Sequence, residues 1–294
     1  MSRIKRSATG EDGRRRDRSR PPMPEPLPSP VTDTHCHMDI ADGDDDEAFS
    51  PEEALAAAAK VGVDRVVQVG CDIAGSQWAV QAAQRYPNVV ATVALHPNEA
   101  PRLAATGTLD DALSEIDRMA GVSERVRGVG ETGLDHFRTT PEGHAAQEES
   151  FRAHIEIARR RGLALVIHDR DAHDDILRVL DDTQLPDRVV FHCFSGDAAM
   201  ARHCAERGWF LSFAGPVTFK NAESLRSALR EVPLEQVLVE TDAPFLTPHP
   251  FRGRPNASYL VPLTVRSVAE VLGRDLEETC SMIQTSTSRA FGSW

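Results

Sequence analysis

The sequence lacks any apolar run long enough to cross a membrane. A membrane-spanning helix needs about 18 or more consecutive apolar residues, and no segment of the 294 residues approaches that length. No apolar stretch follows the basic run Arg14-Arg15-Arg16, so the start of the chain does not have the pattern of an export signal. We therefore expect a protein that does not enter membranes and that works in the cytoplasm.

Three further absences narrow the function. The five cysteines form no CxxC pair, which excludes a zinc ribbon and, without a secretory signal, predicts reduced thiols. No Walker A motif follows an apolar run, and the GxGxxG pattern at 128–133 overlaps the expected strand 126–130 instead of following it, which excludes the common nucleotide cofactors. The chain also has no net positive charge. Its formal charge of -12 argues against a broad basic groove for nucleic acid.

Basic charge is concentrated at the start of the chain instead. Residues 1–30 hold eight Lys or Arg against four acidic residues, are rich in proline and contain almost no aliphatic residues. This composition predicts a disordered tail. A loose arm that attracts polyanions is one interpretation of the tail, and a solvated, inert extension is the favoured one. We take residues 31–294 as a single folded domain, with a monomer as the expected state.

In that domain, short aliphatic runs alternate with helical patterns about eight times. Most runs are near-continuous Val, Ile and Leu, as in parallel strands that are buried on both faces. The expected strands are 31–38, 65–70, 89–95, 126–130, 163–168, 188–192, 209–214 and 236–240. The expected helices include 51–60, 76–86, 144–162, 261–272 and 275–290, with Ser50 as the N-cap of the first.

Eight strand-then-helix units predict either a closed (β/α)₈ TIM barrel or a doubly wound open sheet. The barrel is favoured because side chains that could bind metal recur at the ends of the first, fourth, fifth, sixth and eighth expected strands. An open sheet would spread these positions along a crevice too long for one site. A TIM barrel gathers them at its C-terminal end. The expected fold class is therefore α/β, a TIM barrel with a disordered basic N-terminal tail.

The first of these positions are His35 and His37. Two residues apart on a strand, they share one face and suit a single metal ion, whereas Cys36 between them points the other way. His168 and His192 each end an apolar run. A lone histidine there is more often a core residue than a ligand, but two at equivalent strand ends favour metal binding.

Two acids complete the set. Glu131 follows two glycines, which let backbone and ligand approach closely, and its two oxygens could bridge two cations. Asp242 follows the last strand and could bind metal and accept a proton from an attacking water. Considered alone, Glu131 could equally be a helix-facing or N-cap acid in the turn 131–133, and the alternative for Asp242 is a capping residue in a loop. Taken together with the histidines, they predict a dinuclear hydrolytic centre.

The chain resembles the TatD-type metal-dependent hydrolases of the amidohydrolase-like superfamily. Six motifs in the family's order carry the resemblance: DTHCHMD (33–39), GETGLD (130–135), IHDR (167–170), HCFSG (192–196), ETDAPFL (240–246) and RGRPN (252–256). The resemblance covers residues 31–292. One departure is His136, where the family commonly has an aromatic residue such as Tyr, and this puts substrate specificity in doubt.

The resemblance implies a TIM barrel that holds two divalent cations, with Mg, Mn and Zn all compatible with the mixed ligands. One ion would be held by His35, His37 and Asp242, the other by His168 and His192, with Glu131 as the bridge. Family members are described as DNases, and some act on D-aminoacyl-tRNA esters. We therefore expect a DNase of the 3'-5' exonuclease type in which Asp242 and Glu131 are catalytic.

Three alternative functions stay open. One is a D-aminoacyl-tRNA deacylase. A second is a small-molecule amidase or lactonase of the same superfamily, although phosphotriesterase-like members often carry a carboxylated lysine where Glu131 stands. The third is a noncatalytic nucleic-acid-binding protein that uses the basic tail, which the acidic domain and the complete ligand set argue against.

Substrate contacts are expected from four residues. Arg170 shares a strand face with His168 if the strand persists, and it would grip a phosphate; a surface salt bridge is the alternative. His96, at the end of the third strand, would orient the substrate, with structural packing as its alternative. Lys220 and Arg252 are weaker candidates for the rim. Because the domain is acidic, the expected partner is short or single-stranded DNA, or the end of a tRNA.

Overall fold

The computed structural model describes residues 3–9, 13, 15–43 and 49–294. The chain divides into two compact units. Unit 1 comprises Met1–Val67, Asp197–Glu206 and Ser212–Thr287, and unit 2 comprises Gln68–Gly196, Arg207–Leu211 and Ser288–Trp294.

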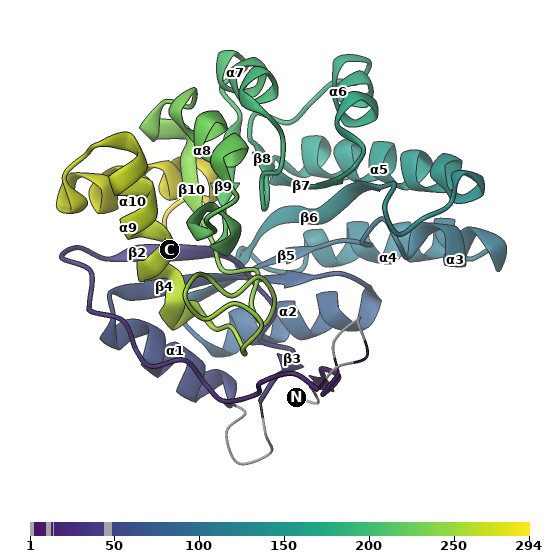
Figure 1. Ribbon diagram of the computed structural model, residues 1–294. Helices are drawn as coiled ribbons and strands as arrows, with labels where there is room; N and C mark the ends of the chain where they lie inside the picture. The colour runs from purple at the N-terminus through teal and green to yellow at the C-terminus, as the bar shows by residue number, and fades with distance from the viewer. Residues whose placement is uncertain (1–2, 10–12, 14, 44–48) are drawn as a thin grey trace. The chain divides into compact units, whose positions relative to one another are not determined.

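Strands and helices alternate along the chain (Figure 1). Eight strands form one sheet in the order β10-β9-β8-β7-β6-β5-β4-β2. This order follows the sequence, and the pairings from β5 to β9 are parallel, as successive strand-helix units require. The strands are β2 (Val31–Cys36), β4 (Val63–Gly70), β5 (Val89–Val93), β6 (Val126–Asp135), β7 (Ala164–Arg170), β8 (Val189–Phe191), β9 (Phe210–Phe213) and β10 (Val237–Val239).

All eight expected strands occur, but two continue beyond their predicted ends. β6 runs to Asp135 and β7 to Arg170, because the ladder between them persists through the pairs Gly133↔His168 and Asp135↔Arg170. Glu131 therefore lies within a strand, and the idea that it caps a turn after the strand was wrong. The strand persistence on which the placement of Arg170 depended is confirmed.

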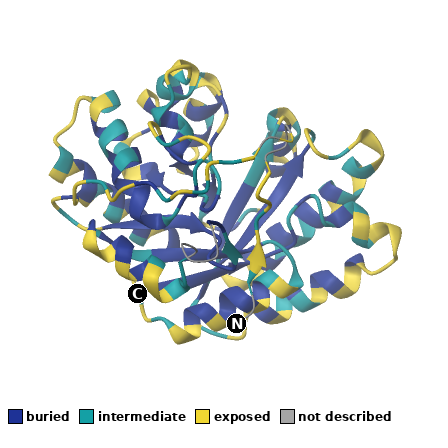
Figure 2. Cartoon of the chain, turned by 60° about the horizontal axis from the view of Figure 1, so that its bottom comes forward, coloured by how far each residue is buried: buried dark blue, intermediate teal, exposed yellow. Residues whose placement is uncertain are grey.

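The helices of unit 2 are α2 (Ile73–Arg85), α3 (Ala100–Ala105), α4 (Leu109–Ala120), α5 (Pro141–Arg161) and α6 (His173–Asp181). The strands are buried almost throughout, whereas the helices are buried on one face and exposed on the other (Figure 2). On α4, for example, the apolar residues Leu109, Leu113 and Ile116 are buried and the acids of its first turn are exposed.

The helices that begin in unit 1 are α1 (Pro51–Lys60), α7 (Ala198–Glu206), α8 (Glu223–Arg230), α9 (Val261–Leu272) and α10 (Leu276–Phe291). The N-cap predicted for α1 is confirmed, because Ser50 Oγ accepts a hydrogen bond from Glu53 N at 3.2 Å. The Glu53 carboxylate accepts one from Ser50 N at 2.8 Å, which completes a capping box. No helix in the described ranges is long and apolar enough to cross a membrane.

The described part of residues 1–30, which we call the arm, contains little regular structure, as its composition predicts. Its one strand, β1 (Ile4–Lys5), pairs in parallel with β3 (Ile40–Ala41). Towards its end the arm packs onto unit 1: Leu27 is 7 % exposed, and the Tyr259 hydroxyl donates to Pro21 O at 2.6 Å. The last third of the predicted tail therefore belongs to the packed body of unit 1.

Candidate metal centre

In unit 1 the structure brings together His35, His37 and Asp242. The backbone holds them there: Asp242 N donates to His35 O at 2.9 Å, and His37 N donates to Ala243 O at 2.8 Å. The two Nε2 atoms of the histidines lie 3.2 Å apart. Asp242 Oδ1 lies 3.4 Å from His37 Nε2 and 3.8 Å from His35 Nε2. We call these three residues the HHD group.

Asp242 has a left-handed backbone with φ of 53°, which is costly for a residue other than glycine. Buried polar side chains hold the chain on either side of it. Asn256 Nδ2 donates to Thr241 O at 2.9 Å and to Phe245 O, and Asp33 accepts from Thr241 N at 2.9 Å and Thr241 Oγ1 at 2.6 Å. Burial raises the pKa of Asp33 to about 6. Asp33 and Asn256 were not among the expected site residues, although both lie in the family motifs.

In unit 2 the structure brings together Glu131, His168 and His192, which we call the EHH group. Glu131 Oε2 lies 3.0 Å from His168 Nδ1 and 2.9 Å from His192 Nε2. The two imidazole nitrogens are 3.3 Å apart. Glu131 and His168 lie on the neighbouring strands β6 and β7, and His192 directly follows β8, the next strand of the sheet.

Gly130 permits the close approach of β6 to β7 beside Glu131. A Cβ atom at this position would meet Val166 O at 2.5 Å, well inside the normal contact distance. The close approach predicted at this glycine is thus found between two strands, and an approach of a ligand stays a prediction.

The spacing of both groups fits a divalent ion. Two ligand atoms bound at 2.0–2.1 Å to a tetrahedral metal lie about 3.3 Å apart. Within each group the three donor atoms are separated by 2.9 to 3.8 Å. Each group also combines two imidazoles with one carboxylate, a donor set suited to zinc and tolerant of other first-row ions.

A residue outside the predicted ligand set, Asp135, orients one of the ligands. Its Oδ2 lies 3.4 Å from His168 Nε2, the nitrogen on the far side of the ring from Glu131. Asp135 is itself fixed by Arg138 N at 2.8 Å and Asn98 Nδ2 at 3.2 Å. Carboxylates in this position set the tautomer and direction of a metal-binding histidine. Its place on the same strand as Glu131 was the signal that could have identified it.

The surroundings of the EHH group keep the Glu131 carboxylate ionised. Burial alone would raise the pKa of Glu131, but His192 first, together with hydrogen bonds from His168 and His192, outweighs burial and holds that pKa well below its ordinary value. Burial lowers the pKa of His168, and hydrogen bonds to Asp135 and Glu131 reverse this and raise it. The Cys71 thiol also donates to Glu131 Oε1 at 3.2 Å. Glu131 is therefore an anionic, well-anchored carboxylate.

His96 lies beside the EHH group, as its predicted role requires. Its Nε2 is 3.8 Å from Glu131 Oε2, and its ring centroid is 4.4 Å from that of His168. Burial lowers the pKa of His96 to about 3, so the imidazole is neutral near pH 7. Because its Nδ1 accepts a hydrogen bond from Asn98 N at 3.1 Å, the proton is on Nε2.

The other three residues predicted to contact substrate are Arg170, Lys220 and Arg252. The guanidinium of Arg170 lies 4.0 Å from the centroid of the Phe137 ring, and no acid among the described residues pairs with it. The alternative of a surface salt bridge for Arg170 is therefore not observed. Arg252 is exposed, and its guanidinium lies 4.7 Å from the centroid of the Phe219 ring. Lys220, which follows Phe219 in the sequence, is also exposed. No contact among the described residues joins Lys220 or Arg252 to the HHD group, so their role stays a prediction.

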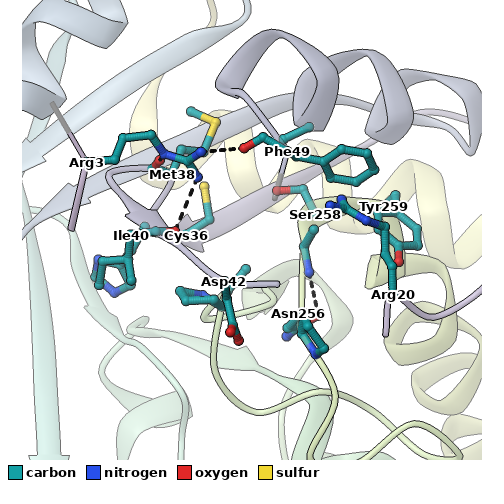
Figure 3. A pocket seen from close by; sticks show the side chains of 16 residues that line it. Arg3, Arg20, Cys36, Met38, Ile40, Asp42, Phe49, Asn256, Ser258 and Tyr259 are labelled. Atoms are coloured by element: carbon teal, nitrogen blue, oxygen red, sulfur yellow. Dashed lines mark hydrogen bonds between the residues drawn. The ribbon is translucent and has the colours of Figure 1, made fainter. Parts of the chain in front are cut away.

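The arm reaches a small cavity of about 40 Å³ that His37 lines in unit 1. Figure 3 shows Arg3 and Arg20 of the arm at this cavity. Arg3 Nε donates to Met38 O at 2.6 Å, and the Arg20 guanidinium lies 3.0 Å from the Phe49 ring centroid. The basic arm thus lies against the segment that follows the two histidines of the HHD group.

Comparisons with known proteins agree with this donor set. A family model described as TatD related DNase matches residues 32–292. A Mycobacterium tuberculosis protein named uncharacterized metal-dependent hydrolase TatD is 45% identical over 240 residues, which are 80% of this chain and 88% of that protein. The Citrobacter rodentium protein named 3'-5' ssDNA/RNA exonuclease TatD is 32% identical over 82% of this chain and 91% of its own length.

The fold has a counterpart among solved structures. The crystal structure of YjjV, a TatD homologue from Escherichia coli, superposes with a TM-score of 0.80 at 26% sequence identity, covering 90% of this chain and 98% of that one. The predicted (β/α)₈ TIM barrel is thereby confirmed. The chain belongs to the TatD family of metal-dependent hydrolases.

Proposed function

We propose that this protein is a divalent-metal-dependent DNase that hydrolyses phosphodiester bonds from the 3' end of a strand. The observation that carries the proposal is the spacing in the HHD and EHH groups, where nitrogen and oxygen donors lie within 2.9 to 3.8 Å of one another. The exonuclease name of the Citrobacter rodentium relative supports the choice of a phosphodiester.

In this proposal the two groups each hold one ion of a single dinuclear centre. His35, His37 and Asp242 would bind one ion, and His168 and His192 the other. Glu131 has two carboxylate oxygens and would bridge the two. When bound, such ions lower the pKa of water and neutralise charge on the phosphoryl oxygens.

The remaining roles belong to side chains of the chain itself. Asp242 would accept the proton of the attacking water, because its short carboxylate is oriented and 15% exposed. Arg170 would grip a phosphate through its guanidinium, which no described acid neutralises. The neutral His96 would donate from Nε2 and orient the substrate, with Lys220 and Arg252 at the rim.

The substrate is proposed to be short or single-stranded DNA. The net charge of -12 makes a long duplex an unfavourable partner, because extended phosphate contacts need many basic residues. A strand end requires only local neutralisation. The end of a tRNA carries an ester that the same centre could hydrolyse, so D-aminoacyl-tRNA serves as the comparison substrate.

The test uses metal-stripped protein reloaded with Mg²⁺, Mn²⁺ or Zn²⁺ and a 5'-labelled single-stranded oligonucleotide. We expect a ladder of products shortened from the 3' end. The double variant His35→Asn/His37→Asn should lose bound metal and at least about a hundredfold in kcat/KM, while the exposed control His249→Asn keeps both. Hydrolysis of D-aminoacyl-tRNA without DNA cleavage would move the assignment to a deacylase.

A second measurement of kcat/KM tests whether the HHD and EHH groups act as one centre. Adding His168→Asn to the double variant should cost little further activity, because residues that act as a unit have non-additive effects. Independent, multiplying losses would contradict a single dinuclear centre.

A further inference from the structure

Phe137 is an exposed aromatic residue close to the EHH group. Its side chain is 58% exposed, whereas almost all other large apolar side chains of unit 2 are buried. It lies in the loop that joins β6 to α5, two residues after Asp135. Open aromatic rings of this kind are often binding surfaces, because their apolar faces gain stability when a partner covers them.

The loop that carries Phe137 is fixed to the end of β7. His136 N donates to Arg170 O at 3.0 Å, and Asp135 contacts the ligand His168. The Phe137 ring therefore lies a few residues along the backbone from a proposed metal ligand. Its position does not depend on a long or unsupported loop.

Arg170 lies over the Phe137 ring, with its guanidinium carbon 4.0 Å from the ring centroid. This cation–π contact holds a positive charge beside a planar apolar surface. Arg170 shares a face of β7 with His168, so the Cα atoms of the two residues lie about 7 Å apart along the strand. A phosphate and its neighbouring base need this combination of charge and flat apolar surface.

A second ring pair stiffens the same loop. The imidazoles of His136 and His144 stack with their centroids 3.8 Å apart and their planes 10° from parallel. His144 is in turn held by Thr139 O at 3.1 Å from Nε2. Stacking ties the loop to the first turn of α5, so Phe137 is presented from a rigid support.

We propose that Phe137, with Arg170, forms a stacking platform for an unpaired nucleobase next to the phosphate that is cleaved. The inference rests on the proposed DNase function and extends it to one specificity-determining residue. Stacking on a phenyl ring tolerates all bases but requires the base to be free of its partner. The platform therefore selects single-stranded ends over duplex ends, with little preference for sequence.

The experiment compares two oligonucleotides, one intact and one with abasic sites in its last three 3' positions, in wild type and Phe137→Ala. For the metal-loaded wild type we expect kcat/KM to be about tenfold higher on the intact strand. Phe137→Ala should reduce that ratio to near one, mainly through KM. Phe137→Tyr, which keeps a stacking ring, should restore it. Val122→Ala, which removes another exposed apolar side chain of unit 2, is the matched control.

Two results would overturn the platform. One is an equal loss on intact and abasic strands in Phe137→Ala, which would indicate general damage; the other is no loss on either. Binding of a fluorescent ten-residue oligothymidine, measured by anisotropy, separates this inference from the nuclease assignment. If no DNA is cut but Phe137→Ala still weakens binding about tenfold, the nuclease proposal fails, and Phe137 stands as a stacking site for an unpaired base. Equal affinity in both proteins refutes the platform.

Discussion

At the scale of single residues, the contact between Asp135 and His168 gives the sharpest expectation. Asp135 Oδ2 lies 3.4 Å from the ring nitrogen that faces away from Glu131. Burial raises the pKa of Asp135, but hydrogen bonds, from His168 first, outweigh it and hold the pKa below its ordinary value. A permanently charged carboxylate there strengthens the imidazole as a ligand.

Asp135→Asn should therefore weaken metal binding about 10- to 100-fold while leaving the fold intact. Competition with a chromogenic chelator measures the affinity, and circular dichroism checks the fold. Asp181→Asn, which removes an exposed acid that pairs with Arg207 at 3.0 Å, is the control. Unchanged affinity in Asp135→Asn would show that the contact does not tune the ligand.

His154 on α5 gives a prediction about pH. It is fully buried, donates from Nδ1 to Ser150 O at 2.7 Å, and accepts at Nε2 from Leu95 N at 3.0 Å, so the structure requires a neutral ring. Burial lowers its pKa from 6.5 to about 4. The unfolded chain therefore takes up a proton first as the pH falls, and the stability from this group is present above pH 6.5 and lost towards pH 4.

The expected loss over that window is about 3 kcal/mol in the free energy of unfolding. Urea denaturation of wild type and His154→Gln at several pH values measures it. The wild-type advantage over the variant should shrink steadily as the pH falls from about 7 to about 4. Parallel pH profiles for the two proteins would show that His154 carries no such linkage.

At the scale of elements, the β6–β7 pair supports the EHH group. Gly130 lets the two strands approach, since a Cβ there would meet Val166 O at 2.5 Å. Gly130→Ala should force the strands apart, lower the free energy of unfolding by about 1–3 kcal/mol and displace Glu131. Thermal unfolding and metal content of the purified protein are the measurements.

Gly162, the left-handed residue that ends α5, offers a control at the same scale. It has φ of 63° and open space around its Cα, so Gly162→Ala costs only the strained backbone, about 1 kcal/mol. Its metal content should stay normal. Loss of metal in both variants would mean that general destabilisation, not strand spacing, explains the effect of Gly130→Ala.

At the scale of the whole molecule, the arm contributes to the stability of unit 1. Arg16 contacts both oxygens of Asp42, at 3.0 and 2.6 Å, and Arg6 contacts Oδ2 at 3.0 Å. Burial alone would raise the pKa of Asp42, but its two arginines hold it below the ordinary value. The composition favoured an inert tail, but in the structure Arg6 and Arg16 of this tail neutralise the nearly buried Asp42.

Removing residues 1–20 should lower the free energy of unfolding by about 1–2 kcal/mol, because Asp42 loses both cations. Asp42→Asn in the full chain removes the same ion pairs by replacing the acid instead of the arginines. Combined with the truncation, it should add little, and urea denaturation of all four proteins completes the cycle. Fully additive losses would show that the arm acts elsewhere.

Much of the fold and of the candidate site could be predicted from local patterns in the sequence. The eight strands were located because buried parallel strands have near-continuous apolar runs. The six proposed ligands were found because they follow those runs. Strand ends were less certain: β6 continues past Gly130 only because β7 supplies hydrogen-bond partners as far as Arg170.

The sequence by itself determined the alternation of strands and helices and the order of the metal-binding side chains along the chain. Both can be recognised from short stretches of a few residues, namely apolar runs, helical patterns and the polar residue at the end of each run. Only the tertiary structure decided that Asp135 faces His168, that Arg170 covers Phe137 and that Arg16 pairs with Asp42. These pairs depend on strand register, loop path and side-chain rotamer, which are set by contacts between segments far apart in the chain.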